Sequence, residues 1–292
     1  MTVATVRRRR RFVLGDAALT AWGLLGLVFL FFPIVVIVVF SFNSGRTLQA
    51  FEGFSIQPYL DALANPAITN AISVSLVTAA GTAVVSTVLG TFAGIALTRR
   101  PGWWAPGLLV LLGLVMVTPE IVSAISLLPW FVSLGTDWGV AFFNIGQVRL
   151  IVANSLFASA VVTFIVRARM AGMNEALEEA AADLYATPLR RFTDVTLPLI
   201  SPAVISGALL AFTLSLDNTV VSSFVSVAGS TPWPVYIFAS LKASLRPEIA
   251  AMSTLMLALT LVVLGIVALI LRRDPTGDGG GASGLTGAMV GR

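Results

Sequence analysis

The sequence contains no cysteine and no histidine, and its one lysine is Lys242. Without thiol and imidazole groups the chain forms no disulfide and carries none of the usual zinc or haem ligands, nor a cysteine or histidine for covalent catalysis. Lys242 follows a leucine, whereas the phosphate-binding pattern G-x-x-x-x-G-K-[ST] requires a glycine there. We therefore expect no Walker-type ATPase site in this chain.

Charged residues are also scarce. They make up 11% of the 292 residues, whereas hydrophobic residues make up 57% and the mean hydropathy is +0.94. Soluble domains carry about a quarter charged residues, so this composition excludes an ordinary soluble fold. The composition predicts an all-α, polytopic membrane protein.

Long apolar runs are abundant, and a helix needs about 20 apolar residues to cross a bilayer. We predict one transmembrane domain over residues 17–273, between a basic N-terminus at 1–16 and a flexible glycine-rich tail at 274–292. Arg149 lies at the outer edge of the fourth run. The six predicted spans cover residues 18–42, 69–98, 107–134, 148–168, 200–227 and 249–271.

Basic residues are distributed unequally between the two sides of these spans. Apart from Arg292 at the end of the tail, thirteen Lys and Arg residues lie before the first span, after the sixth, or at the second and fourth connections, and four lie on the other side. Cytoplasmic loops are enriched in Lys and Arg, so both termini are predicted to be cytoplasmic. This asymmetry and contact with lipid headgroups explain the net charge of +4 without any nucleic-acid partner. The first apolar run is longer than that of a cleavable signal peptide, and we read it as an uncleaved helix.

A polar stretch, EALEEAAADLYATPLRRFTDVTLPLISPAV, occupies residues 175–204 on the predicted cytoplasmic side. Asn174 is a candidate N-cap for a short helix whose first turn carries Glu175 and Glu178, where negative charge is favourable. An amphipathic connecting loop is the simpler reading. A structureless connection of about 30 residues is uncommon, however, so an ordered docking element is favoured.

A second short helix is expected in the same stretch. The chain should turn near Ala186, and Thr187 followed by Pro188 is typical of a cap and a first helical residue. We expect this second helix to end at Pro198. The pattern thus predicts a helix-turn-helix outside the membrane.

These residues carry a resemblance to a known family. The order of residues in this stretch, with Glu-Ala-Ala at 179–181 and Leu-Pro at 197–198, is similar to that in the EAA loop of permease subunits in binding-protein-dependent ABC importers. In that family the loop forms coupling helices that sit in a groove of the ATPase subunit. The glycine of that pattern falls at Tyr185, which suggests a different turn geometry or a bulkier contact. The resemblance assigns ATPase coupling, within a loop at about 170–199, to Glu179, Ala180, Ala181, Tyr185, Leu197 and Pro198, with Val195 completing the motif.

Further motifs narrow the resemblance. VVFSFNSGR, VTPEIVSAISLL, AFTLSLDNTVVSSFVS and RPEIAAMSTLMLALTLV occur in the order seen in PotC-type permeases of spermidine/putrescine transporters. This resemblance implies the type I importer (MetI-like) fold, the bacterial cytoplasmic membrane and polyamine translocation. It also implies a second permease, two ATP-binding subunits that hold ATP and magnesium, and an extracytoplasmic polyamine-binding protein, with no cofactor in this chain.

Two acidic residues, Glu120 and Asp217, lie inside predicted spans. A carboxylate at mid-membrane costs about 2.5 to 3.5 kcal/mol on insertion scales, so such residues usually face an aqueous path or the protein interior. They are candidates for a cation pathway, together with Asn218, at a position where relatives often have a second acid, and Trp233. As structural alternatives, Glu120 could cap a broken helix after Pro119 and Asp217 could pair with a neighbouring subunit.

Small and aromatic residues give weaker signals. Gly90 and Gly94 form a G-x-x-x-G pattern that permits close helix approach, either within this subunit or toward another one. Tryptophans near the span ends are typical of interface anchors, and Trp233 is an alternative vestibule residue. The belt candidates are Trp103, Trp104, Trp138 and Trp233.

Other functions are compatible with parts of this pattern. The same kind of importer could carry another solute, such as an aminophosphonate or ferric ion. A proton-coupled secondary transporter could use Glu120 and Asp217 as a relay, although it gives no reason for the EAA loop. A structural membrane scaffold would have no use for intramembrane acids.

Overall fold

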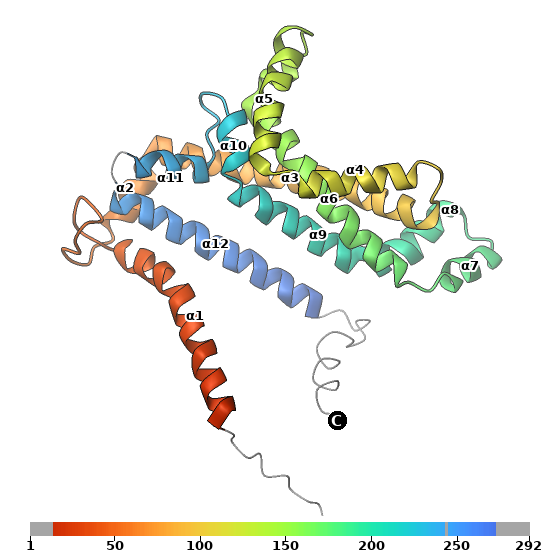
Figure 1. Ribbon diagram of the computed structural model, residues 1–292, viewed down its shortest axis with the longest axis horizontal. Coiled ribbons are helices and arrows are strands. Elements are labelled where there is room, and N and C mark those ends of the chain that lie inside the picture. Colours follow the sequence, from red (N-terminus) through yellow and green to blue (C-terminus); the bar gives the residue numbers. More distant parts are fainter. Residues whose placement is uncertain (1–13, 243–244, 273–292) are drawn as a thin grey trace, which may run out of the picture. The chain divides into compact units, whose positions relative to one another are not determined.

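A computed structural model describes residues 14–242 and 245–272, and their regular structure is helical apart from one isolated β-bridge between Asn43 and Phe54. The all-α prediction is therefore confirmed (Figure 1). The predictions for residues 1–13 and for the glycine-rich tail lie outside the described residues. The chain divides into two compact units, residues 1–62 with 245–255 and residues 63–244 with 256–292, which are considered separately below.

Within the described residues, five segments are long and apolar enough to cross a membrane, and each overlaps a predicted span. A sixth span is present if the bent pair described below counts as one, which agrees with the predicted number. The long helices are α1 (Leu14–Phe40), α3 (Pro66–Arg99), α6 (Gly146–Ala171), α9 (Leu197–Asp217) and α12 (Pro247–Arg272).

The predicted third span is broken rather than continuous. Helix α4 (Ala105–Val117) and helix α5 (Glu120–Thr136) meet at a bend of 107°. The bend falls at Thr118 and Pro119, where Thr118 is extended with φ −65° and ψ 127°. A proline disfavours the α conformation in the residue before it, which accounts for the position of the break. The predicted span over 107–134 is therefore present only as a bent pair of helices, and the break after Pro119 agrees with the structural alternative given for Glu120.

The predicted fifth span is too long at its far end. Helix α9 ends at Asp217, and a separate short helix, α10 (Val220–Val225), follows it. Asn218 interrupts the helix with an extended backbone at φ −71° and ψ 98°. Apolar residues resume directly after Asp217, Asn218 and Thr219, which is why the predicted run extended to residue 227.

The second helix of the polar stretch does not end at Pro198. Helix α8 (Pro188–Arg191) passes through a π-helical turn, η2 (Phe192–Thr196), directly into α9. In this turn the N–H of Leu197 donates to the carbonyl of Phe192, five residues back. A widened turn and the first positions of α9 accommodate a proline that lacks an N–H, so the expected break is replaced by a continuous segment.

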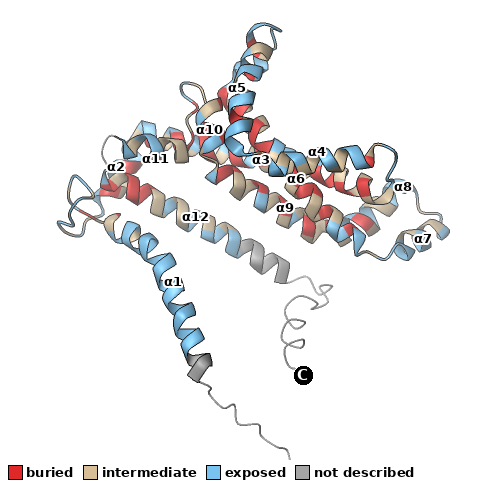
Figure 2. Cartoon of the chain, in the orientation of Figure 1, coloured by how far each residue is buried: buried red, intermediate tan, exposed pale blue. Residues whose placement is uncertain are grey.

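Helices α3, α6 and α9 form the core of the second unit, and buried residues follow their shared faces (Figure 2). A Cβ on Gly90 would lie 2.6 Å from Cβ of Val162, and a Cβ on Gly94 would lie 3.0 Å from Cβ of Val166. From the α9 side, a Cβ on Gly207 would lie 3.1 Å from Val162. The G-x-x-x-G pattern therefore serves helix packing within this subunit.

Arg149 is buried near the start of α6, at the edge of the predicted fourth span. Its guanidinium donates to the carbonyl of Phe143 and lies 3.5 Å from Oδ1 of Asn144. Both partners belong to a 3-10 turn, η1 (Ala141–Asn144). Acceptors at the carboxyl end of a helical turn favour a positive charge, so the arginine is satisfied where the chain enters its span.

In the first unit, Asn43 organises the connection between α1 and the short helix α2 (Gln57–Ala64). Its fully buried side chain donates to the carbonyls of Thr47 and Ala50 and accepts from the N–H groups of Gly45 and Glu52. These bonds give the VVFSFNSGR motif a structural role in fixing a loop.

Candidate functional site

The bend between α4 and α5 forms part of a pocket of about 120 Å³ within the second unit. Residues of α6, of α10 and of the α9–α10 break complete its wall. Its polar lining consists of Thr118, Glu120, Ser123, Asn154 and Asn218, and its apolar lining consists of Val115, Leu127, Ala153, Leu156, Phe157 and Val221. The pocket thus combines one carboxylate with amides, hydroxyls and apolar surface.

Glu120 is the first residue of α5 and is exposed. It lies at the break of the third span rather than inside a continuous helix. The positive end of the α5 dipole and the free N–H groups of its first turn favour a carboxylate at this point. The charge is therefore stabilised locally and is also presented to the pocket, so the structural and the pathway readings of Glu120 are compatible.

Asn218 lines the same pocket and has a structural partner. Its Oδ1 accepts the N–H of Val221, in the first turn of the short helix α10, at 2.9 Å from one residue before the N-cap, Thr219. Asn and Asp are both strong N-cap residues, so the break at this position is compatible with an amide as well as with an acid. Its carbonyl oxygen is occupied by this bond.

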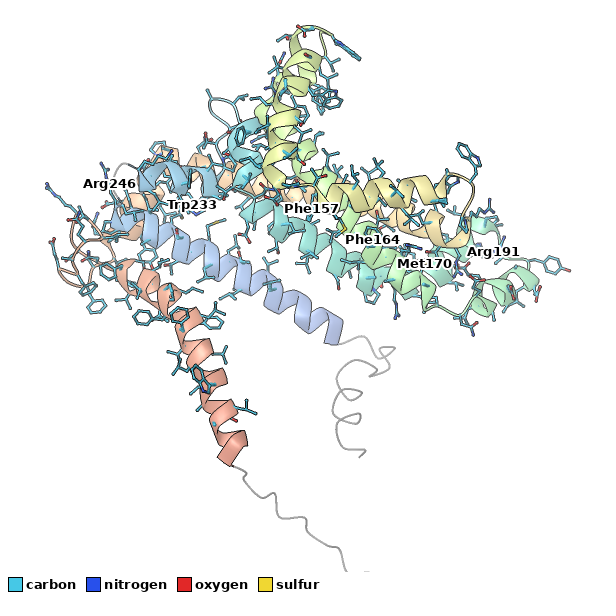
Figure 3. The ribbon with its side chains drawn as sticks, viewed as in Figure 1. Phe157, Phe164, Met170, Arg191, Trp233 and Arg246 are labelled. Carbon is cyan, nitrogen blue, oxygen red and sulfur yellow. The ribbon has the colours of Figure 1, made fainter. Side chains whose placement is uncertain are left out.

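Asp217 and Trp233 do not appear among the residues that line this pocket. Asp217 is the exposed last residue of α9. Trp233 is 5% exposed at the start of helix α11 (Trp233–Leu241). Its backbone N–H donates to Oγ of Ser75 on α3 at 2.7 Å. Figure 3 places Trp233 well apart from Phe157 of the pocket wall.

Asn154 was not among the predicted site residues. It lies in the middle of α6 and is 5% exposed, and it contributes to the pocket wall. The signal that could have found it is an amide inside the apolar run LIVANSLF, because polar side chains within spans are expensive to bury. Asn154 was missed because the search for polar residues within this span considered only charged side chains.

The polar stretch forms the predicted pair of helices. Helix α7 (Ala176–Asp183) begins after Asn174, whose Oδ1 accepts the N–H of Ala176 at 3.0 Å. Thr187 caps α8 by accepting the N–H of Arg190 at 3.4 Å, and Pro188 is its first residue. Thr187 is thus confirmed as the N-cap of α8, whereas Asn174 bonds to the first N–H of α7 from one residue before its N-cap, Glu175.

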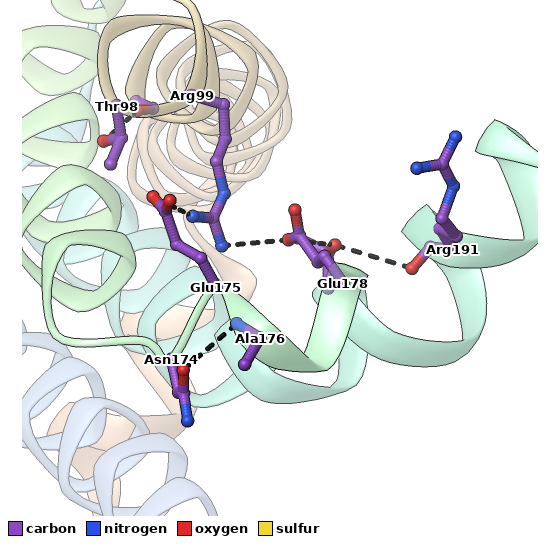
Figure 4. Close-up of polar contacts among 9 residues, drawn as sticks. Thr98, Arg99, Asn174, Glu175, Ala176, Glu178 and Arg191 are labelled. Atoms are coloured by element: carbon purple, nitrogen blue, oxygen red, sulfur yellow. Dashed lines mark hydrogen bonds and ion pairs between the residues drawn. The ribbon is translucent and has the colours of Figure 1, made fainter. Parts of the chain in front are cut away.

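Arg99, at the end of α3, connects this segment to the core of the unit (Figure 4). Its Nη1 lies 2.6 Å from Oε1 of Glu175, and its Nη2 lies 3.0 Å from Oε1 of Glu178. The same oxygen of Glu178 accepts from Oγ1 of Thr196 in the π-helical turn at 2.7 Å. One carboxylate therefore joins α3, α7 and the start of the fifth span.

Tyr185 occupies a left-handed conformation, with φ 58°, directly after α7. The N–H of Ala186 donates to the carbonyl of Ala181 at 3.0 Å, and the N–H of Tyr185 donates to that of Ala182 at 2.9 Å. This pair of bonds defines a Schellman motif, in which glycine usually takes the left-handed position. The backbone thus keeps the turn that suits glycine, and the tyrosine side chain is 96% exposed.

The other predicted coupling residues lie on the same segment. Glu179 and Ala180 are exposed on α7, whereas Ala181 is half-buried. Leu197 and Pro198 begin α9 and are exposed. Beside Tyr185, the side chains of Leu184 and Leu189 are 82% and 72% exposed, so the tip of the helix pair presents apolar surface.

Comparison with known proteins relates this architecture to transport systems. Residues 86–273 match the family model for "Binding-protein-dependent transport system inner membrane component". The putrescine transport system permease protein PotI of Escherichia coli K12 is 38% identical over 248 residues, covering 85% of this chain and 86% of the relative. The spermidine/putrescine transport system permease protein PotC of the same strain is 35% identical over 248 residues, covering 85% and 91%.

Among solved structures, the chain is similar to a crystal structure of a bacterial ABC transporter involved in the import of the acidic polysaccharide alginate. The TM-score is 0.73 at 14% identity, and the alignment covers 90% of this chain and 96% of the other. At this identity the likeness concerns the fold alone. It confirms the expected fold of type I importer permeases.

Proposed function

Since the chain belongs to the family of inner-membrane components of binding-protein-dependent transport systems, we propose that it is the permease subunit of an ATP-driven polyamine importer. The observation that carries the substrate class is the identity of 35 to 38%, across 85% of the chain, to permeases for putrescine and for spermidine and putrescine. Family membership alone leaves the substrate class open.

The chemistry of the pocket supports a cationic substrate. A polyamine is an aliphatic chain with protonated amines at intervals, so its path requires acidic or carbonyl groups separated by apolar walls. Glu120 supplies the charge, and Leu127, Phe157 and Val221 supply apolar surface. Asn218 lies in the same wall, and Asp217 directly precedes it at the end of α9. A site of this size and modest charge can release its substrate again, as transport requires.

Energy in this proposal comes from partner subunits. Two ATP-binding subunits would hold ATP and magnesium, a second permease would complete the path, and an extracytoplasmic binding protein would deliver the polyamine. The chain itself carries out no covalent chemistry. It lies in the bacterial cytoplasmic membrane with both termini in the cytoplasm.

The helix pair of residues 176–191 is the proposed contact with the ATPase. Its exposed apolar tip is the surface for docking, and the ion pairs of Arg99 transmit its displacement to α3. Helix α3 packs along α6, which contributes to the pocket wall, and along α9, which leads into the break at Asn218. Movement of α7 therefore changes the wall of the substrate pocket in alternating access.

The test is uptake of radiolabelled putrescine by the complete complex, with the substitution Glu120→Gln. Loss of one charge-assisted contact is worth about 1.5 to 3 kcal/mol, so transport should fall about tenfold or more while assembly stays intact. Asp137→Asn removes a carboxylate at the opposite end of α5 and should leave transport unchanged.

Two results would contradict the proposal in different ways. Transport by Glu120→Gln at the wild-type rate would remove Glu120 from the pathway. A wild-type complex that takes up neither putrescine nor spermidine, but does take up an aminophosphonate or ferric ion, would replace the substrate class.

A further inference from the structure

Asn154 is a buried amide whose hydrogen-bonding groups are not used within the described part of the chain. The residue is 5% exposed, and both its Oδ1 and its Nδ2 are buried without a hydrogen-bond partner there. It lies on α6 among the residues that line the pocket. A buried amide without partners is unfavourable, because it has lost its hydration and gained nothing in exchange.

Two of the other polar groups of the pocket, those of Asn218 and Thr118, already have partners. Oδ1 of Asn218 already accepts the N–H of Val221, and Oγ1 of Thr118 donates to the carbonyl of Leu114. Glu120, at the start of α5, is the carboxylate of the pocket. The wall therefore holds two kinds of acceptor suited to a cation, the charge of Glu120 and the neutral carbonyl of Asn154.

We propose that Asn154 and Glu120 form a subsite for a primary ammonium group of the translocated substrate. A primary ammonium has three N–H donors and no acceptor, so it can bond to a carboxylate oxygen and to an amide oxygen at once. The methylene groups next to the nitrogen would lie against the apolar wall at Phe157 and Leu127. This inference rests on the proposed polyamine function and deepens it.

The two residues have separable roles in this subsite. Glu120 attracts any cation, because its contribution depends on charge. Oδ1 of Asn154 requires an N–H donor, so it distinguishes a primary ammonium from a quaternary ammonium of the same charge. Asn154 is therefore the residue that determines specificity for unmethylated amines.

The experiment compares two dications on the assembled complex in lipid nanodiscs, without the binding protein. Radiolabelled putrescine is displaced either by unlabelled putrescine or by its bis-quaternary analogue, in which each nitrogen carries three methyl groups. The measured quantity is the ratio of the two inhibition constants. It is determined for wild type, Asn154→Leu, Glu120→Gln and Ser155→Ala.

Ser155→Ala is the matched control for the loss of a buried polar group. Ser155 is the next residue of α6, is 5% exposed, has an Oγ without a described partner, and is not among the residues that line the pocket. Leucine is close to asparagine in size and relieves a buried unpaired amide, so Asn154→Leu should assemble.

In the expected result, wild type prefers putrescine to its quaternary analogue, and Asn154→Leu lowers this preference about tenfold or more by weakening putrescine. Glu120→Gln weakens both dications, and Ser155→Ala matches wild type. The proposed subsite is wrong if Asn154→Leu prefers putrescine over the quaternary analogue as strongly as wild type does. It is also wrong if the wild-type complex shows no saturable binding of putrescine. If the wild-type complex nevertheless imports putrescine, only the subsite fails, whereas absence of putrescine uptake overturns the proposed function.

Discussion

Replacing Arg99 by glutamine should release the proposed coupling segment, the helix pair of residues 176–191, from α3. The contact of Arg99 with Glu175 is worth about 0 to 1 kcal/mol, because the side chain of Glu175 is 70% exposed. The contact with Glu178 joins side chains that are 15% and 26% exposed, and hydrogen bonds to charged groups contribute about 1.5 to 3 kcal/mol. Together they amount to about 2 kcal/mol, or roughly a 30-fold change in the ratio of docked to undocked segment.

Hydrogen exchange of the purified chain in nanodiscs measures this ratio. Peptides that cover residues 176–186 should exchange up to about 30-fold faster in Arg99→Gln, if their amides open by undocking of α7. Arg100→Gln is the matched control, since it removes the same charge from the next residue, which is exposed. In the complete complex, Arg99→Gln should hydrolyse ATP with less putrescine imported per turnover. Equal exchange in Arg99→Gln, Arg100→Gln and wild type would refute the reasoning.

Two further substitutions test the packing and the turn. Gly90→Ala places a Cβ 2.6 Å from Cβ of Val162 and 2.9 Å from a backbone nitrogen, so thermal unfolding in detergent should show a loss of about 1 to 3 kcal/mol. Gly113→Ala on α4, where a Cβ meets nothing within 4 Å in the described chain, should be neutral or stabilising; equal losses would contradict the packing argument. Tyr185→Gly should stabilise the turn after α7 by about 1 kcal/mol, because glycine adopts the left-handed conformation without strain, and amide hydrogen exchange there should slow about fivefold. Leu184→Gly, at φ −80°, should not slow it. Faster exchange in Tyr185→Gly would show that the tyrosine side chain stabilises the turn.

The spans were predictable from sequence because a helix needs about 20 apolar residues to cross the bilayer, and such a run can be recognised from neighbouring residues alone. Hydropathy did not predict the bends, since apolar residues flank the short polar interruptions at 118–120 and 217–219 on both sides; only the alternative of a helix broken after Pro119 anticipated the first bend. Pro119 and Asn218 are the local signals, and each breaks a helix by backbone preference within a predicted span. A test of hydropathy alone cannot detect such a break.

The hydrogen bonds at the helix starts of the coupling segment were predictable, because Asn174 and Thr187 bond to backbone within three residues. Its attachment was not, because Arg99 and Glu178 are 79 positions apart. Arg99 contributed only as part of the charge asymmetry that predicts topology. Tyr185 suggested an altered turn, whereas the structure keeps the glycine type of turn and places the tyrosine in it.

For the candidate site, the sequence indicated Glu120 and Asn218, which line one pocket, and also Asp217 and Trp233, which do not. Spacing within the chain cannot show which of several polar residues face the same space when the helices that carry them are bent. Asn154 was passed over because an amide adds no charge. Its burial without a described partner becomes visible only when α6 is packed.

The most direct test of the central claim is accumulation of radiolabelled putrescine by cells that express the complete complex, with the proton gradient collapsed and ATP maintained. The account predicts that accumulation continues under these conditions and stops when the ATP-binding partner is inactivated by substitution. If accumulation stops when the proton gradient is collapsed and is unchanged by inactivation of the ATP-binding partner, the proposed ATP-driven import is contradicted and a proton-coupled transporter is favoured.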